Sequence, residues 1–177
     1  MTSKIIETPL SNIDLNELLK DINKTLGENK KINIFTVDEM IKSPKIFNDE
    51  LKKNHYCIIF LKPKNTNIGH WVIMFKNDKN EIYFFDSYGN NPLNLSKKLY
   101  DFLLKYYPNT IYNSVQYQKY SSKVATCGRW CMFVISMLKI FKNLNVDKLN
   151  IVLKNMKNKY KMPYDNIISS LINFDIE

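Results

Sequence analysis

The chain has 177 residues, of which 45% are hydrophobic and 24% charged, as is typical of a globular protein with a substantial buried core. Its four glycines and six prolines argue against long flexible linkers, and no apolar run reaches the roughly 20 residues of a membrane span. The three cysteines provide no disulfide framework, and the N-terminus lacks the apolar stretch of a secretion signal. We therefore expect a protein of a reducing compartment.

The net charge of +9 permits electrostatic association with nucleic acid. Basic residues are densest at 97–98 and 153–162, where a solvated basic helix face is the simpler interpretation. No basic and aromatic motif of a known nucleic-acid-binding module accompanies them in the sequence. We therefore expect DNA binding, if it occurs, to be non-specific.

The N-terminal third is predicted to be helical. Residues 10–27 have the apolar spacing of an amphipathic helix, and Gly27 is a suitable residue to end it. Two shorter helices are predicted over residues 36–43 and 44–54. The break between them is expected at the Ser-Pro pair that joins the two segments.

Short runs of β-branched and aromatic residues follow at 55–62, 70–76 and 81–87, and they predict strands. The polar sequence NDKN between the last two predicts a tight hairpin turn. Because these runs are almost continuously hydrophobic, we expect a sheet that is covered on both faces. Residues 110–118 are a further strand candidate.

More helices are predicted downstream of the strands. They cover residues 93–107, a segment that begins at Cys127, residues 146–159 and a segment after Pro163. Helices on both sides of a central cluster of strands predict an α+β domain. We expect one domain over residues 1–177, made of a helical N-terminal part (1–54), a central core (55–141) and C-terminal helices (142–177).

The chain has only two histidines, His55 and His70, which restricts both acid–base and metal chemistry. If residues 70–76 and 81–86 pair as a hairpin, His70 and Asp86 lie at the same end of adjacent strands. A carboxylate beside an imidazole fixes the tautomer of the ring and stabilises its charged form. His55 is expected to be an ordinary residue at a strand edge.

Cys127 is a candidate nucleophile because it lies at the predicted start of a helix, after a possible cap at Thr126. The N–H groups and the dipole at a helix N-terminus favour a thiolate and could hold a developing oxyanion. Gly128 would leave room beside the sulfur for a substrate backbone. Together with His70 and Asp86, Cys127 would form an activated cysteine nucleophile.

The other two cysteines, Cys57 and Cys131, are expected to be core residues. Cys57 lies inside a predicted strand, and Cys131 follows Cys127 by one helical turn. A zinc site built from His55, Cys57, Cys127 and Cys131 can be imagined. However, the His-x-Cys and Cys-x3-Cys spacings depart from those of common zinc ligands, so we expect no metal site.

Three segments carry a resemblance to a known family: GHWVIMF (69–75), IYFFDSYG (82–89) and TCGRWCMFV (126–134). In the order His, Asp, Cys they resemble the adenain-like and ubiquitin-like-protein-specific cysteine proteases, and most of all the processing proteases of large DNA viruses, virophages and related elements. The resemblance covers about residues 60–130. It implies a papain-like α+β fold of the adenain type, with a central, mostly antiparallel sheet flanked by helices and the catalytic cysteine at a helix N-terminus.

The resemblance also implies roles for individual residues. His70 would be the general base, Asp86 its orienting carboxylate and Cys127 the nucleophile. Trp71 would form an aromatic wall of a narrow substrate site, opposite the turn formed by Cys127 and Gly128.

A glutamine that donates to the oxyanion is part of the same family pattern, six or seven residues before the cysteine. Those positions hold Tyr120 and Ser121 here. Gln118 is therefore the preferred candidate, with Gln116 as the alternative. An insertion within the segment KYSSKVAT would explain the longer spacing.

The function that the resemblance implies is a cysteine endopeptidase that cleaves capsid or other virion precursor proteins, after Gly-Gly-type sequences, during particle maturation. One alternative is an isopeptidase that removes ubiquitin-like proteins, and another is an inactive protease-like module that binds DNA or a protein. No cofactor is required, although DNA or a short peptide could serve as an activator. We expect a monomer without membrane contact, acting in the virion and in the virus factory of the host cytoplasm.

Overall fold

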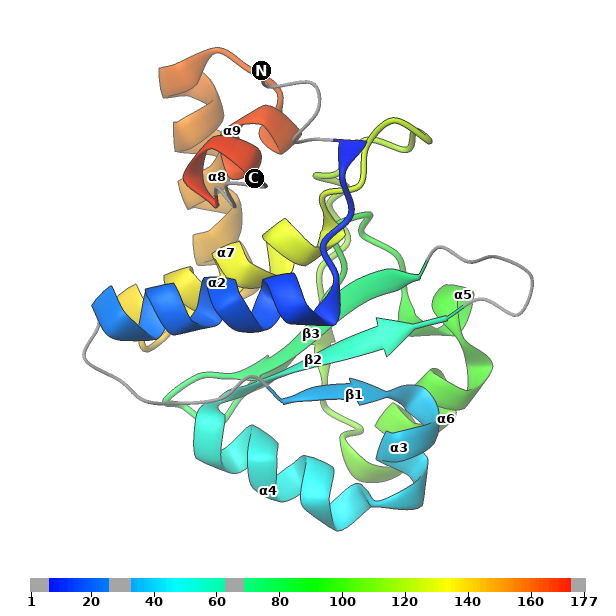
Figure 1. Ribbon diagram of the computed structural model, residues 1–177. Coiled ribbons are helices and arrows are strands. Elements are labelled where there is room, and N and C mark those ends of the chain that lie inside the picture. The colour runs from blue at the N-terminus through cyan, green and yellow to red at the C-terminus, as the bar shows by residue number, and fades with distance from the viewer. Residues whose placement is uncertain (1–6, 26–32, 63–68, 173–177) are drawn as a thin grey trace. The chain divides into compact units, whose positions relative to one another are not determined.

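The structure is a computed structural model that describes residues 7–25, 33–62 and 69–172. The chain divides into two compact units, one formed by residues 33–116 and the other by residues 1–32 together with 117–177. The first unit is coloured light blue to green in Figure 1. Over the described ranges, no helix is both long enough and apolar enough to cross a membrane.

The unit of residues 33–116 contains a five-stranded sheet in the order β1-β2-β3-β4-β5. The strands are β1 (Ile34–Thr36), β2 (Tyr56–Leu61), β3 (His70–Lys76), β4 (Ile82–Phe85) and β5 (Ile111–Tyr112). β3 is antiparallel to both β2 and β4, whereas β1 is parallel to β2 and β5 is parallel to β4. The sheet is therefore mixed: its central pairings are antiparallel, as expected, whereas the parallel pairings at its two edges were not expected.

The two parallel pairings arise because helices connect those strands instead of tight turns. α3 (Val37–Lys42) and α4 (Pro44–Asn54) lie between β1 and β2, and α5 (Pro92–Leu95) and α6 (Lys97–Tyr106) lie between β4 and β5. The single helix predicted at 93–107 is thus two helices, because the side chain of Ser96 caps a new start by accepting the N–H of Leu99.

Two strand predictions also need correction. β1 has no counterpart among the predicted strands, since it is only three residues long and half-buried throughout. The strand expected over 110–118 is reduced to Ile111–Tyr112. Short edge strands carry too few residues for a clear alternating pattern, so the sequence signal there is weak.

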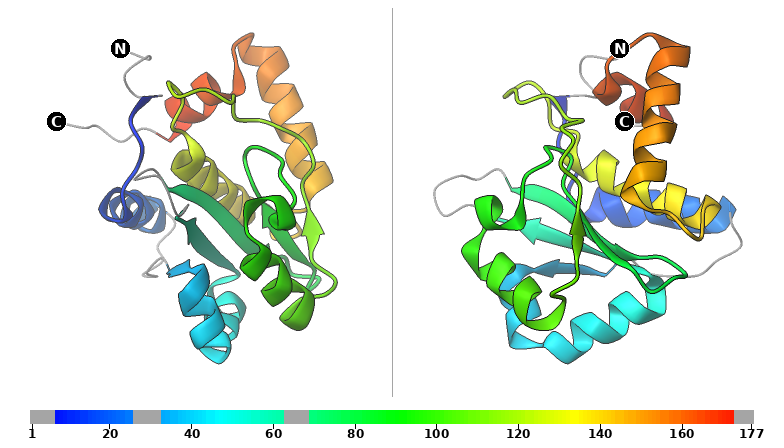
Figure 2. Two further views of the ribbon diagram at one scale, coloured as in Figure 1. Left: turned by 90° about the vertical axis from the view of Figure 1, so that its right-hand side faces the viewer. Right: turned by 180° about the vertical axis from the view of Figure 1, so that it is seen from behind.

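One face of the sheet packs against α3, α4 and α6, which Figure 2 shows as the light-blue and green helices on one side of the strands. The buried residues of this core are Met40, Phe47, Leu51, Cys57, Ile59, Leu61, Val72, Met74, Phe84, Leu99, Phe102, Leu103 and Tyr107. The strand residues that point to the opposite face of the sheet, such as Ile58, Ile73 and Phe85, are also buried. Both faces are therefore covered, as the continuous hydrophobic runs predicted.

Cys57 and His55 have structural places in this unit. Cys57 is fully buried, and burial raises the pKa of its thiol far above the ordinary range, which confirms a core residue. His55 is the left-handed residue that ends α4, with φ of 65°, and its N–H donates to the Leu51 carbonyl at 3.0 Å. The ring Nδ1 of His55 lies 3.3 Å from the carbonyl oxygen of Lys76, next to the start of β2.

The other unit is helical in its described parts. It contains α2 (Asn12–Thr25), α7 (Cys127–Ile140), α8 (Val146–Tyr160) and α9 (Tyr164–Leu171). These helices confirm the predictions, although Gly27, the predicted end of the first helix, lies outside the described residues. α7 packs against α2 and α9, and Cys131 on α7 is only 1% exposed, as expected of a core cysteine.

Candidate active site

His70 and Asp86 are brought together by the β3–β4 hairpin. His70 is the first residue of β3, and Asp86 directly follows the last residue of β4. Ile73 of β3 pairs with Phe85 of β4, so the start of β3 and the end of β4 lie at the same end of the hairpin. The two-residue turn inside NDKN closes the opposite end, where Asn80 adopts a φ of 63°. The predicted proximity is confirmed.

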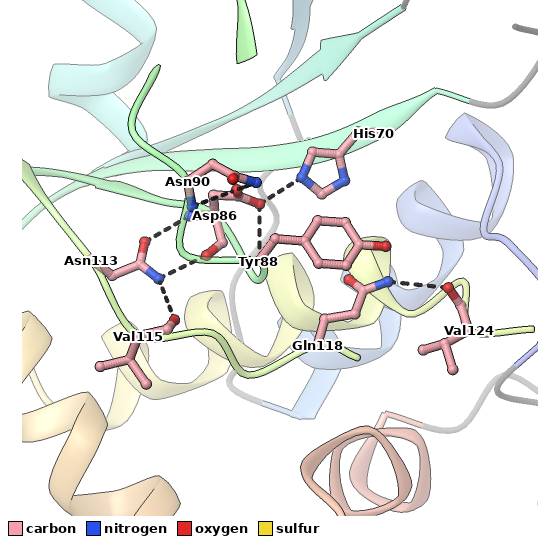
Figure 3. Close-up of polar contacts among 8 residues, drawn as sticks. All are labelled: His70, Asp86, Tyr88, Asn90, Asn113, Val115, Gln118 and Val124. Carbon is pink, nitrogen blue, oxygen red and sulfur yellow. Dashed lines mark hydrogen bonds and ion pairs between the residues drawn. The ribbon is translucent and has the colours of Figure 1, made fainter. Parts of the chain in front are cut away.

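A short hydrogen bond joins the two side chains. The Nε2 atom of His70 lies 2.6 Å from Oδ1 of Asp86, as Figure 3 shows. The Asp86 side chain is fully buried, and the His70 side chain is 16% exposed. A buried carboxylate at this distance fixes the orientation of the ring and the tautomer of its neutral form.

The turn after β4 holds the Asp86 carboxylate in place. Oδ2 accepts the backbone N–H of Asn90 at 3.0 Å and its side-chain Nδ2–H at 2.9 Å. Oδ1 accepts the N–H of Tyr88 at 3.2 Å in addition to its contact with His70. With four donors, the buried carboxylate is well satisfied and has one defined rotamer.

Asn113 holds the backbone of the same residue. Its Oδ1 accepts the N–H of Asp86 at 2.8 Å, and its Nδ2 donates to the carbonyl oxygen of Asp86 at 2.7 Å and to that of Val115 at 3.2 Å (Figure 3). Asn90 and Asn113 are supporting residues that the sequence reasoning missed. Asn90 could have been noticed as the last polar residue of DSYGN, the turn in which Asp86 accepts the N–H of Tyr88 as an Asx-type turn, whereas nothing in the sequence links Asn113 to Asp86.

Two aromatic residues lie next to His70, Trp71 in sequence and Tyr88 in space. The Tyr88 ring lies against the His70 ring, at 5.0 Å between centroids. Trp71 is 5% exposed and packs on Phe60 at 4.4 Å, on the face of β3 opposite to His70 because strand residues alternate. Tyr88 is therefore the aromatic neighbour of the imidazole ring, and the role of Trp71 as a wall of the substrate site stays a prediction.

Cys127 is the first residue of α7, as predicted, and it is 8% exposed. The N–H groups of the first turn of a helix lack intrahelical partners and carry the positive end of the dipole. Thr126 does not cap the helix through its side chain, which corrects the expectation. Its hydroxyl instead donates to Oδ1 of Asp165 at 2.5 Å.

Gly128 has a packing reason for being glycine. A Cβ at this position would lie 3.1 Å from Cβ of Leu10 and 3.3 Å from Cδ2 of Leu15. The missing side chain lets α2 and the segment before it approach α7 closely. The expectation that Gly128 leaves space for a substrate backbone stays a prediction beside this structural role.

Gln118 belongs to the same unit as Cys127. It is 1% exposed, and its Nε2 donates to the carbonyl oxygen of Val124, three residues before Cys127, at 3.3 Å (Figure 3). Gln116 is exposed. The structure thus holds the amide of Gln118 against the segment that leads into α7.

A buried arginine next to the thiol was not anticipated. Arg129 is fully buried and its Nη1 donates to the carbonyl oxygen of Thr8 at 2.9 Å, while Nε and Nη2 have no hydrogen-bond partner among the described residues. Burial lowers the pKa of the guanidinium, and the neighbouring Asp14 and Cys127 oppose that effect.

The predicted site residues therefore fall into two sets. His70, Trp71 and Asp86 belong to the unit of residues 33–116, whereas Gln118, Cys127 and Gly128 belong to the other unit. In the described parts of the chain, no three His, Cys, Asp or Glu side chains cluster as metal ligands.

The chain is an α+β protein with a mixed five-stranded sheet and a His–Asp pair, its carboxylate buried, where β3 begins and β4 ends. No family model matches its sequence. The uncharacterized protein V9 of Sputnik virophage is 29% identical over 177 residues, a match that covers 92% of this chain and 93% of the virophage protein. The chain is thus similar to a viral protein over nearly its whole length.

Two solved structures were also compared. The central domain of the uncharacterized Lpg1148 protein from Legionella pneumophila has a TM-score of 0.47 at 16% identity and covers 93% of each chain. A structure titled AvrA delL154 with IP6 and CoA has a TM-score of 0.48 at 16% identity, covering 94% of this chain and 59% of AvrA.

Proposed function

We propose that the chain is a cysteine endopeptidase with a papain-like site of the adenain type, in which Cys127 is the nucleophile, His70 the general base and Asp86 the carboxylate that orients the base. The observation that carries this proposal is the 2.6 Å hydrogen bond between His70 and the fully buried Asp86. An activated thiol requires a base held in this way. Cys127, at the first position of a 14-residue helix, supplies the thiol.

The contact with Asp86 determines which side of the imidazole would react. Asp86 binds Nε2, so Nδ1 would accept the proton of the Cys127 thiol. The thiolate would attack the scissile carbonyl carbon, and the imidazolium would protonate the leaving amine as the C–N bond breaks. Water, deprotonated by His70, would then hydrolyse the thioester, releasing a carboxylate product and restoring the thiol.

The oxyanion of each tetrahedral intermediate would be held by the first N–H groups of α7 and by the amide of Gln118. Support for Gln118 comes from its burial and from its hydrogen bond to Val124, which keep the amide near the start of α7. A single donor of this kind accelerates acyl transfer by about 10²- to 10³-fold.

The substrates we propose are capsid or other virion precursor proteins, cleaved after Gly-Gly-type sequences during particle maturation. The similarity to a virophage protein supports a viral setting. We place the enzyme in the virion and in the virus factory, acting as a monomer. DNA or a short peptide is a candidate activator, given the net charge of +9.

The test is co-expression of the wild-type chain or Cys127→Ala with a candidate capsid protein, followed by mass spectrometry of the products. We expect Cys127→Ala to abolish cleavage and Cys131→Ser, a matched change one turn along α7, to retain it in the folded fraction. Full cleavage by Cys127→Ala would refute the proposal. Labelling by a ubiquitin vinyl-sulfone probe, without cleavage of virion proteins, would indicate the isopeptidase instead.

A second experiment needs no substrate and tests whether His70 activates Cys127. We expect His70→Ala to slow alkylation of Cys127 by iodoacetamide at pH 6 by roughly tenfold or more, because a thiol without its base reacts slowly at that pH. His55→Asn is the matched control, since asparagine tolerates the left-handed backbone of that position. Equal alkylation rates in the wild type and both variants would favour the alternative of an inactive protease-like module that binds DNA or a protein.

A further inference from the structure

A buried carboxylate near the C-terminus lies outside the proposed catalytic set. Asp165 is in the first turn of α9 and is 4% exposed. Burying a carboxylate is unfavourable unless hydrogen-bond donors satisfy it. The hydrogen-bond donors of Asp165 therefore show which segments of the chain its carboxylate connects.

Three donors reach Asp165, and they come from both sides of the proposed oxyanion site. Oδ1 accepts the hydroxyl of Thr126 at 2.5 Å and the indole Nε1–H of Trp130 at 3.2 Å. Oδ2 accepts the backbone N–H of Lys119 at 2.9 Å. Thr126 directly precedes Cys127, and Lys119 directly follows Gln118, so one carboxylate joins the nucleophile-bearing helix to the loop that carries the glutamine.

The residue on the other side of Gln118 is anchored to the same two helices. The Tyr117 ring stacks on Trp130 of α7 at 5.3 Å and meets Tyr164 of α9 edge-on at 5.5 Å. Gln118 is thus fixed from both neighbours, by ring packing at Tyr117 and by the backbone bond of Lys119. Segment 117–126 has no helix or strand of its own, so these contacts replace regular secondary structure in holding it.

We propose that Asp165 is a positioning residue that sets the amide of Gln118 relative to the sulfur of Cys127. The inference rests on the proposed function. Apolar packing alone would hold α9 in place, since Ile167 and Ile168 are buried. A carboxylate is needed because it binds a hydroxyl and a backbone N–H at fixed positions, and displacement of an oxyanion donor by about an ångström is enough to lose most of its contribution.

The variant that tests this is Asp165→Asn, which keeps the shape of the side chain. The remaining carbonyl oxygen can serve Thr126 and Trp130, but the new NH2 group faces the N–H of Lys119 and cannot accept it. We expect kcat on a peptide ending in Gly-Gly-aminomethylcoumarin to fall roughly tenfold to a hundredfold with KM little changed. Alkylation of Cys127 by iodoacetamide, which forms no oxyanion, should keep its wild-type rate.

The control is Ser169→Ala, one turn further along α9. Ser169 is also 4% exposed, and its hydroxyl has no hydrogen-bond partner among the described residues. This change should leave kcat unchanged. If Asp165→Asn does not fold, Thr126→Val, which removes only the hydroxyl bond to Asp165, takes its place.

A double-mutant cycle with Gln118→Ala decides whether Asp165 acts through Gln118. If it does, Asp165→Asn in the Gln118→Ala background causes no further loss of kcat. Losses that multiply, an effect confined to KM, or wild-type kcat in the folded variant would overturn the positioning role. Failure of the proposed function itself is distinguishable, because Cys127→Ala would then retain cleavage.

Discussion

At the scale of single residues, the proposed chemistry depends on Asp86. Its carboxylate is fully buried, contacts His70 at 2.6 Å and accepts three further hydrogen bonds from Tyr88 and Asn90. Each carboxylate oxygen thus has two donors, and these contacts fix the rotamer of Asp86 and the orientation of the His70 ring.

We expect Asp86→Asn to lower kcat/KM by roughly 10²- to 10⁴-fold, by analogy with carboxylate-to-amide changes in other triads. In either amide orientation the NH2 group would face a donor, His70 or Asn90, and the imidazolium would lose its counter-charge. Steady-state kinetics on the Gly-Gly peptide check this. Asp101→Asn, at an exposed residue that pairs with Lys97 on α6, is the matched control, and comparable rates for the two variants would contradict the role of Asp86.

At the scale of elements, a turn and a helix start position the site. The turn after β4 requires glycine at position 89, which has a φ of 71°, and a Cβ there would lie 2.8 Å from the carbonyl carbon and oxygen of Val115. The N–H of Gly89 donates to the carbonyl of Asp86 at 2.8 Å. The backbone geometry of this turn and the orientation of Asp86 are therefore coupled.

Gly89→Ala should destabilise the protein by about 1–3 kcal/mol, because the left-handed conformation and the contact with Val115 are both unfavourable for a side chain. Activity should fall as well, since the turn holds Asp86. Urea unfolding measures the first effect and peptide kinetics the second. Asn80→Gly, at the other left-handed turn of the sheet (φ 63°), should instead be neutral or slightly stabilising; equal effects of the two changes would count against this account.

At the scale of the whole molecule, buried ionisable groups and the excess of positive charge govern the response to solution conditions. Tyr107 lies in the apolar core beneath the sheet. Burial, assisted by the neighbouring Cys57 and Asp49, raises the pKa of its hydroxyl from 10.0 to about 12. The unfolded chain therefore loses this proton at a lower pH than the folded protein does.

Stability should fall as pH rises from about 10 towards 12, because the folded state then binds more protons than the unfolded state. A shift of this size corresponds to a loss on the order of 1–3 kcal/mol over the whole window. Urea unfolding at pH 8, 10 and 11 measures the slope. Tyr107→Phe should flatten it and the exposed Tyr106→Phe should not, so an unchanged slope in Tyr107→Phe would assign the alkaline loss to other groups.

The net charge of +9 predicts sequence-independent DNA binding that weakens steeply with salt, because lysines release counterions from the phosphates. The exposed basic end of α8 is the surface to alter. Its lysines are Lys154, Lys157, Lys159 and Lys161. Replacing two of them by glutamine should lower the salt slope in fluorescence anisotropy by up to about two, and Lys52→Gln, at an exposed lysine of α4 outside both basic segments, is the control. DNA binding whose affinity does not depend on salt concentration would exclude this electrostatic mode of binding.

Features that depend on neighbours along the chain could be predicted from the amino-acid sequence alone. The NDKN turn and the two hydrophobic runs place His70 beside Asp86, and the polar-to-apolar change at Cys127 marks the start of α7. Both depend on contacts within about twenty residues, whose periodicity and turn chemistry can be read directly.

Only the tertiary structure decided the features that depend on distant segments. The parallel pairing of β1 and β5, the support of Asp86 by Asn113 and the link from Asp165 to Thr126 join residues whose separation in sequence carries no pattern. Likewise, Gln118 is distinguished from Gln116 by burial and not by spacing. The physical reason is that a turn or a helix start is specified by local backbone preferences, whereas the partner of a buried polar group is specified by the packing of the whole chain.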